Sequence, residues 1–173
     1  MTSDREFPTA LAAALAAPFD YDDGERIDFE PFAAFLSAED TTDWWRAWTD
    51  NTESSGDDFR VFGQDGTGGY AAFWLVRPDG ALVDQPVVFL GSEGETAVVA
   101  RDLADFLWLL ADGVGPCEAA GGYGTDRGPR PDRRLTAVAE RFAPGRQQSA
   151  AAVIERAARE FPDFDDIVTE LCR

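Results

Sequence analysis

The spacing of apolar residues divides the chain into three stretches. Helical intervals of three and four residues occupy the first third, short runs typical of β-strands occupy the centre, and helical intervals return toward the end. In the first third, helices are expected over residues 9–17, 29–36 and 43–48. Pro8 is placed to open the first of these helices, and Thr41 and Thr42 are placed to cap the third. Residues 50–58 are polar and predict a loop.

The central stretch predicts an antiparallel sheet. Runs rich in Val, Phe, Tyr and Trp are expected to form strands over residues 59–62, 70–77, 86–90 and 96–100. Turns that contain Gly separate these runs, which favours hairpin connections. Alternation along the second strand would put Tyr70, Ala72, Trp74 and Val76 on one face and Ala71, Phe73 and Leu75 on the other. Because both faces are apolar, we expect helices to cover at least one of them, and cover on both stays open.

Further helices are expected after the sheet. One apolar stripe is formed by Leu103, Phe106, Leu107 and Leu110, with Asp102 placed as its cap and Gly113 as its end. Similar stripes occupy residues 135–142, 153–161 and 164–171, and the segment 113–131 is expected to be a flexible link rich in Gly, Pro and Arg. The whole pattern predicts an α+β fold in which a central antiparallel sheet of about four to six strands packs against helices. We expect one domain, with a core at residues 59–113, an acidic helical part at 1–58 and C-terminal helices at 131–173.

Length and composition suit a folded protein that stays in the cytoplasm. With 173 residues and a hydrophobic content of 45%, the chain can bury a core without help from a metal or a disulfide. No stretch reaches the apolar length of a membrane span, and Asp4, Arg5 and Glu6 stand where a secretory signal would need a basic and apolar start. Cys117 and Cys172 lack the spacing of a redox or metal motif. Two unpaired thiols are therefore expected, with a disulfide between them as the open alternative.

Two residue types are missing from the chain, and their absence excludes many mechanisms. There is no His, and all 15 basic residues are Arg. The chain therefore cannot form a Ser-His-Asp triad, a Cys-His pair, an imidazole metal site, a P-loop lysine or a lysine Schiff base. The remaining route to catalysis would be paired carboxylates, as in glycoside hydrolysis, but 33 acids will form such pairs by chance. We expect no enzyme activity, no cofactor and no metal site.

The negative charge is concentrated at the start of the chain. Of the net charge of -18, residues 1–58 carry -12, residues 59–113 carry -5 and residues 114–173 carry -1. Such a field repels nucleic acid and anionic membranes, and it speeds the encounter with a basic partner. We therefore expect a protein partner with a basic surface, with no nucleic-acid or membrane binding.

The central stretch resembles a known family in the order of its motifs. The chain runs from Phe62-Gly63-Gln64-Asp65 through a Gly-rich turn at 66–69 to Ala72-Phe73-Trp74, and then through residues 86–94 (PVVFLGSEG) and 99–107. This order is similar to that of the SUKH superfamily, the Smi/Knr-like fold widespread among bacterial immunity proteins. The resemblance covers residues 59–113, and it implies a small sheet packed against helices in a protein that binds and neutralises a toxin. Eukaryotic relatives imply an alternative role, a regulatory or scaffold module that binds a housekeeping protein.

Three short motifs suggest functional sites but fail on spacing or context. An EF-hand loop that starts at Asp20 would need Asp or Asn at position 24 and Gly at position 25, where the chain has Gly24 and Glu25. Residues 66–69 lie between two expected strands, whereas a phosphate loop would open a helix, so a hairpin turn is predicted. Ser92 lies in a sequence that is one Gly short of a nucleophile elbow, and no His is present to activate it.

Aromatic and acidic residues are the candidates for partner binding. Trp44 and Trp45 are adjacent and cannot both point inward from one helix, so the group that they form with Trp48 is either core or an interface anchor. Glu93 and Glu95 are turn acids that could accept hydrogen bonds from a partner's Arg or Lys. The candidate partner-binding residues are Asp40, Asp43, Trp44, Trp48, Asp65, Trp74, Glu93 and Glu95. We expect the protein to be a monomer or a weak homodimer.

Overall fold

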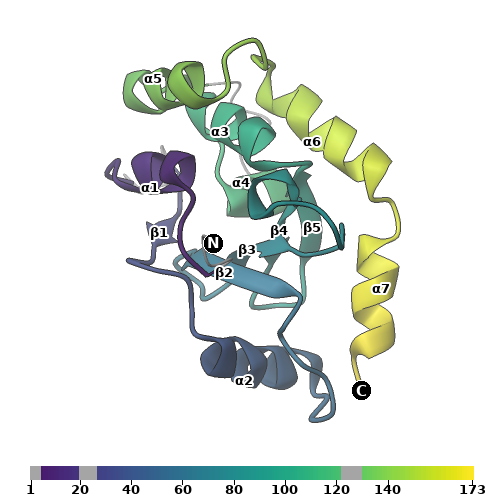
Figure 1. Cartoon of the computed structure of the whole chain (residues 1–173). Coiled ribbons are helices and arrows are strands. Elements are labelled where there is room, and N and C mark those ends of the chain that lie inside the picture. Colours follow the sequence, from purple (N-terminus) through teal and green to yellow (C-terminus); the bar gives the residue numbers. More distant parts are fainter. Residues whose placement is uncertain (1–4, 20–26, 122–129) are drawn as a thin grey trace.

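The computed structural model describes residues 5–19, 27–121 and 130–173 and shows an α+β fold. Antiparallel strands form one meander with the spatial order β1 (Glu30–Pro31), β2 (Phe59–Gln64), β3 (Tyr70–Trp74), β4 (Val87–Leu90) and β5 (Thr96–Ala100). The helices are α1 (Thr9–Leu15), α2 (Ala38–Thr49), α3 (Leu103–Ala111), α4 (Pro116–Gly121), α5 (Arg133–Phe142), α6 (Ala150–Glu160) and α7 (Phe164–Leu171), with a short 3-10 turn η2 (Leu82–Asp84). Figure 1 shows the sheet in the centre, with α2 below it and α6 and α7 along one side.

The two faces of the sheet carry separate apolar clusters. Ala71 and Phe73 of β3 belong to the first cluster, which also contains residues of α1, α3 and α5. Ala72 and Trp74 belong to the second cluster, which also contains residues of α2 and α7. Helices therefore cover both faces, and the predicted alternation along the second strand is confirmed.

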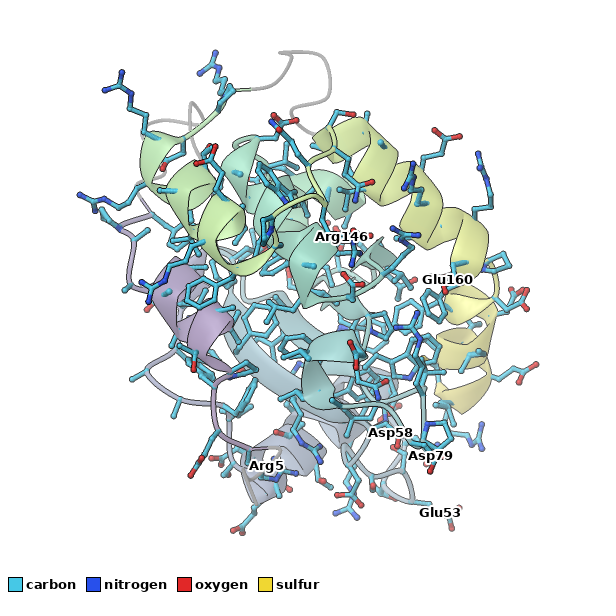
Figure 2. All side chains as sticks on the ribbon, turned by 45° about the horizontal axis from the view of Figure 1, so that its top comes forward. Arg5, Glu53, Asp58, Asp79, Arg146 and Glu160 are labelled. Atoms are coloured by element: carbon cyan, nitrogen blue, oxygen red, sulfur yellow. The ribbon has the colours of Figure 1, made fainter. Side chains whose placement is uncertain are left out.

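Among the helices of the described residues, α3 is the most buried, and a cap and a glycine fix its two ends. Its cap Asp102 accepts a hydrogen bond from the backbone N–H of Asp105 at 2.8 Å, and the chain leaves the helix through Gly113 with a φ of 82°. The side chain of Asp105 is itself fully buried and pairs with Arg101 at 2.7 Å and with Arg146 at 2.8 Å. Arg146, labelled in Figure 2, comes from the connection between α5 and α6, so the ion pair holds this connection against α3.

Residues 29–36 do not form the helix that their spacing predicts. Phe29 packs in the first cluster, whereas Phe32 and Leu36 pack against the second, which one helical face could not achieve. The segment instead runs along β2, where the N–H groups of Phe32 and Leu36 each donate to β2 carbonyls at 2.9 Å. Pro31 lacks the N–H that a helix would use, but it fits the edge strand β1.

Helix α2 begins earlier than the predicted residues 43–48. Its cap is Ser37, whose side-chain oxygen accepts from the N–H of Asp40 at 3.0 Å. The expected caps Thr41 and Thr42 lie inside the helix, and the hydroxyl of Thr41 donates back to the carbonyl of Ser37 at 2.6 Å. Ser37 followed by Glu39 and Asp40 is also a signal for a helix start, and α2 begins there and not at Thr41 or Thr42.

Two further predictions need correction. The second strand was expected to reach residue 77, but β3 ends at Trp74. The N–H of Trp74 donates to the carbonyl of Pro86 on the opposite strand, and Pro86 has no N–H with which to continue the ladder. The expected flexible link at 113–131 contains the helix α4. Residues 122–129 of that link and the rejected calcium motif at 20–25 fall outside the described residues.

The described helices include none with the length and apolar character needed to cross a membrane. Cys117 and Cys172 are both free, as predicted. They lie on α4 and directly after α7, in different parts of the structure.

Candidate protein-binding groove

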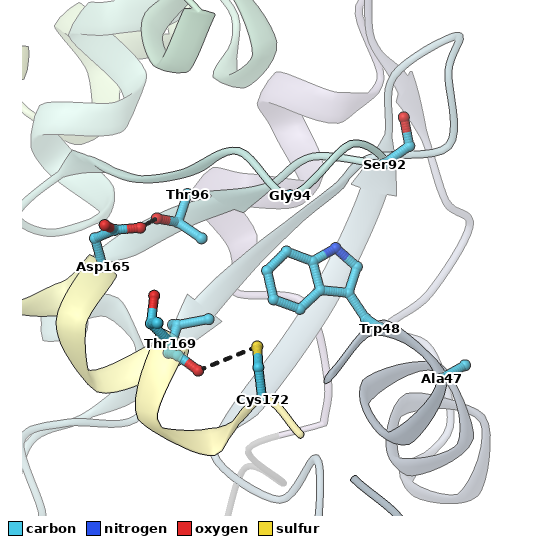
Figure 3. A pocket seen from close by; sticks show the side chains of 9 residues that line it. Ala47, Trp48, Ser92, Gly94, Thr96, Asp165, Thr169 and Cys172 are labelled. Atoms are coloured by element: carbon cyan, nitrogen blue, oxygen red, sulfur yellow. Dashed lines mark hydrogen bonds between the residues drawn. The ribbon is translucent and has the colours of Figure 1, made fainter. Parts of the chain in front are cut away.

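A groove of about 330 Å³ opens between α2, the β4–β5 turn and α7, and we call it the α2–α7 groove. It is lined by Ala47, Trp48, Ser92, Gly94, Thr96, Asp165, Val168, Thr169 and Cys172. Figure 3 shows the Trp48 indole reaching between Ser92 on one side and Thr169 and Cys172 on the other. The volume lies at the lower end of the range of ligand sites, which suits one side chain or a short segment of a partner.

Trp48 is held rigidly although it is only partly buried. Its ring stacks on that of Trp45, with the planes 4° apart and the centroids 5.8 Å apart. Trp45 is 1% exposed and anchors α2 on the second cluster. The indole Nε1–H of Trp48 donates to the carbonyl of Gly91 at 2.8 Å, which ties α2 to the β4–β5 turn. An indole fixed in this way loses little conformational entropy when a partner covers it.

Helix α7 forms the opposite wall because aromatic packing and hydrogen bonds attach it to the sheet and to α2. The ring of Phe164 lies 4.7 Å from that of Trp74 on β3. At the other end of α7, the side chain of Asn51 donates to the carbonyl of Leu171 at 2.8 Å. The N–H of Arg173 donates to the carbonyl of Thr49, the last residue of α2, at 3.0 Å. Both walls of the groove are therefore parts of one connected structure.

Asp165 brings a carboxylate to the groove from the first turn of α7. Its Oδ1 accepts a hydrogen bond from the Thr96 hydroxyl of β5 at 2.5 Å (Figure 3). Within the described residues, no partner is found for the other oxygen, Oδ2. On the same wall, the Cys172 thiol donates to the carbonyl of Val168 at 3.5 Å. The groove thus offers an aromatic ring, a carboxylate oxygen and three hydroxyl groups.

The charge around the groove is negative. None of its lining residues is basic, and Glu93 and Glu95 are exposed on the β4–β5 turn that forms one side. Arg46 of α2 and Arg173, which follows α7, both donate hydrogen bonds to backbone carbonyls. Arg46 donates to the carbonyl of Ser54 at 2.9 Å, and Arg173 donates to backbone carbonyls at the end of α7. A positively charged group would meet no repelling side chain among the lining residues.

The structure brings three of the predicted partner-binding residues together at this groove. Trp48 lines it, and Glu93 and Glu95 flank Gly94, which also lines it. Asp40 and Asp43 are exposed on α2. Trp44 is partly buried, with its ring 4.8 Å from that of Tyr70 on β3, so it packs on the sheet and not in the groove.

Asp65 and Trp74 were also predicted to bind a partner, and the structure buries both. Trp74 is 8% exposed beneath α7. Asp65 is 4% exposed, and its Oδ1 accepts hydrogen bonds from the N–H and hydroxyl of Thr67 and from the N–H of Gly69. Burial alone would raise the pKa of Asp65, but these hydrogen bonds outweigh it and lower the pKa below its ordinary value. Asp65 thus shapes the β2–β3 turn, and neither residue offers a surface to a partner.

The groove also contains residues that the sequence did not single out. Asp165, Thr169 and Cys172 come from the C-terminal helical extension, where only the apolar stripe was considered. A weak signal was present, because Asp165 and Thr169 are four residues apart and therefore share the helix side next to that stripe. Nothing in the sequence indicated that this side would face Trp48.

A second cluster of polar side chains lies where the segment before β1 meets α4. Ligand-type atoms of Asp28, Asp65 and Cys117 are within 4.8 Å of one another. Internal hydrogen bonds account for the arrangement, since Gly66 N–H donates to Asp28 at 2.9 Å and Asp28 N–H donates to Glu118 at 2.6 Å. Burial raises the pKa of the Cys117 thiol and that of the Glu118 carboxyl above their ordinary values. These contacts give the cluster a structural role, the joining of α4 to the β2–β3 turn.

No protein-family model, no curated protein and no solved structure matches this chain. The resemblance to the SUKH superfamily therefore stays an expectation from the order of motifs. What the structure establishes is the α+β fold class, and any function has to be argued from the groove and its charges.

Proposed function

We propose that this chain is an immunity-type protein that binds a basic protein toxin at the α2–α7 groove and neutralises it by direct docking. The observation that carries the proposal is Trp48, a rigid and partly exposed aromatic ring in a groove whose lining residues include one acid, Asp165, and no base. Tryptophan is among the residues that most often dominate the affinity of protein interfaces. Its position in a groove provides the surrounding contacts that exclude water.

The surface around the groove supports a protein partner. Ile167 and Leu171 of α7 are 42% and 38% exposed and add apolar area to the helix that forms one wall. The acids Glu93, Glu95 and Asp165 would steer a basic protein toward this surface and would oppose the approach of nucleic acid. Apolar contact would then supply most of the affinity, and charge would supply the rate of encounter.

Binding of this kind needs no catalytic group in the chain itself. A toxin that acts on nucleic acid carries a basic substrate surface, and an acidic protein docked on that surface blocks the substrate. The proposal places the protein in the cytoplasm, where such a toxin would act. The groove and the charge support a basic protein partner, and the immunity role is what the resemblance to the SUKH superfamily implies.

The test is co-expression with each toxin-like protein encoded beside this chain. We expect the wild-type chain to restore growth and to bind the toxin with an association rate that falls as salt is raised. Trp48→Ala should weaken binding by at least tenfold, whereas Val83→Ala should not change it, because Val83 is 40% exposed on η2 and does not line the groove. Circular dichroism of both variants checks that the fold is retained.

Binding without protection of the cells would instead favour the regulatory role. If no neighbouring toxin binds and none is neutralised, the immunity proposal is wrong. Equal loss of affinity in Trp48→Ala and Val83→Ala would place the binding surface elsewhere.

A further inference from the structure

The groove combines three features that favour one kind of side chain. It has an aromatic face in Trp48, a carboxylate oxygen in Asp165 without a partner among the described residues, and hydroxyl groups from Ser92, Thr96 and Thr169. Hydroxyl groups can accept hydrogen bonds from a donor on the ligand. The described walls contain no basic group, so an anionic ligand would meet only negative charge at short range.

Two contacts fix the Trp48 ring at the groove. Trp45 stacks on one face, and the hydrogen bond from Nε1–H to Gly91 fixes the plane of the ring. The ring of Trp48 also lines the groove (Figure 3). An aromatic face of this kind attracts a planar cation, and a guanidinium stacks on it more often than an ammonium does.

We propose that the α2–α7 groove is an arginine-binding site, in which a partner's guanidinium stacks on Trp48 and donates hydrogen bonds to Oδ2 of Asp165. This inference deepens the proposed function and rests on it for the identity of the partner as a protein. Arginine fits the groove better than lysine, because its flat group can lie on the indole and still present several N–H donors to the carboxylate and the hydroxyls.

Asp165 is suited to this role because its position is fixed before binding. The Thr96 hydroxyl donates a hydrogen bond of 2.5 Å to Oδ1 of Asp165 and so fixes the carboxylate. Oδ2 then remains for the ligand. The neighbouring Asp166 has the same charge and is also exposed, but it does not line the groove. Substitution of Asp165 removes a charge that lines the groove, and substitution of Asp166 removes an equal charge beside it. Comparison of the two variants therefore distinguishes a direct contact with the ligand from a general effect of negative charge.

The experiment uses the full chain labelled with ¹⁵N and needs no toxin. The indole N–H signal of Trp48 is identified as the one missing from the spectrum of Trp48→Phe. The chain is then titrated with the capped peptide Ac-Gly-Arg-Gly-NH₂, with the same peptide containing lysine, and with the one containing citrulline, which has nearly the same shape and no charge. We expect the arginine peptide to shift the Trp48 signal saturably, with a dissociation constant roughly in the millimolar range.

The variants decide between a specific site and a general attraction. Asp165→Asn should weaken arginine-peptide binding about tenfold, and Asp166→Asn should leave it within about twofold of wild type. The citrulline and lysine peptides should each bind at least about fivefold more weakly than the arginine peptide. An absent shift at Trp48, equal losses in the two Asn variants, or equal binding of the lysine peptide would each overturn the proposal.

The two proposals can fail separately. A chain that protects cells from a toxin but does not respond to the arginine peptide would retain the proposed function and reject the arginine site. A chain that binds the arginine peptide as expected but neutralises no toxin would retain the site and reject the immunity role.

Discussion

Removal of the Asp105 side chain should destabilise the protein more than the removal of any exposed acid. Asp105 is 0% exposed and accepts three hydrogen bonds, from Arg101 at 2.7 Å, from Arg146 at 2.8 Å and from Gln148 at 2.6 Å. Arg146 and Gln148 belong to the connection between α5 and α6. The substitution Asp105→Ala would therefore weaken the attachment of this connection to α3 and remove the ion pair of Arg101, while Arg146 keeps its ion pair with Asp102 at 2.9 Å.

The size of the effect follows from what the partners can do afterwards. Loss of one member of a fully buried ion pair costs about 3–5 kcal/mol, because the other charge is left unpaired. Here the side chains of Arg101 and Arg146 are 27% and 41% exposed, so both can regain water. We therefore expect the free energy of unfolding to fall by about 2–3 kcal/mol. For a chain of this length, that corresponds to a melting temperature about 5–10 °C lower.

Urea unfolding followed by circular dichroism at pH 7 measures this difference. The matched control is Glu140→Ala, which removes the same charge from an exposed position on α5. We expect the control to change the free energy of unfolding by less than about 0.5 kcal/mol. If Asp105→Ala behaves like the control, the buried ion pairs do not fasten α3 to the α5–α6 connection, and the reasoning is refuted.

Three further substitutions test other parts of the structure by the same urea assay. Trp48→Phe keeps the stacked ring but loses the hydrogen bond to Gly91, so unfolding should cost about 1 kcal/mol less; no change would mean that water replaces the bond. Phe164→Ala should lower the free energy of unfolding by about 3–5 kcal/mol, because the Phe164 ring is 3% exposed and packs on Trp74. A decrease of less than about 1 kcal/mol would contradict that packing. Burial raises the pKa of Glu118 in the folded protein, so ionisation of this carboxyl opposes folding. The protein is therefore most stable, as far as Glu118 is concerned, while the carboxyl is protonated, and this stability is lost as the pH rises through the folded pKa. Glu118→Gln should therefore be about 1 kcal/mol more stable than wild type at pH 7, and this difference should disappear below the ordinary pKa of 4.5. A difference in stability that does not depend on pH would show that ionisation of Glu118 is not its cause.

Local patterns in the sequence were enough to predict the fold class and most of the elements. Alternation of side chains along a strand is a property of the backbone, so the two faces of β3 could be assigned before any packing was known. The helices α3, α5, α6 and α7 each follow an apolar stripe at helical spacing, and the cap Asp102 and the terminating Gly113 are local signals.

The helix expected at residues 29–36 shows where local patterns fail. Its apolar spacing matches one face of a helix, but Pro31 lacks the N–H that a helix would use and the segment pairs with backbone groups of β2 instead. The burial of Asp65 and Trp74 has the same kind of cause. Whether a polar or aromatic residue is exposed depends on which distant segment covers it, and α7 covers Trp74 from the other end of the chain.

By itself, the sequence determined the α+β class, the apolar character of both faces of β3, the negative charge and the exclusion of imidazole and lysine chemistry, because these depend on composition and on contacts between near neighbours. Only the tertiary structure decided that Trp48, Ser92 and Asp165 line one groove. These residues come from three elements far apart along the chain. The distance between them is set by long-range packing on the second face of the sheet. Local conformational preferences of the three segments do not determine it.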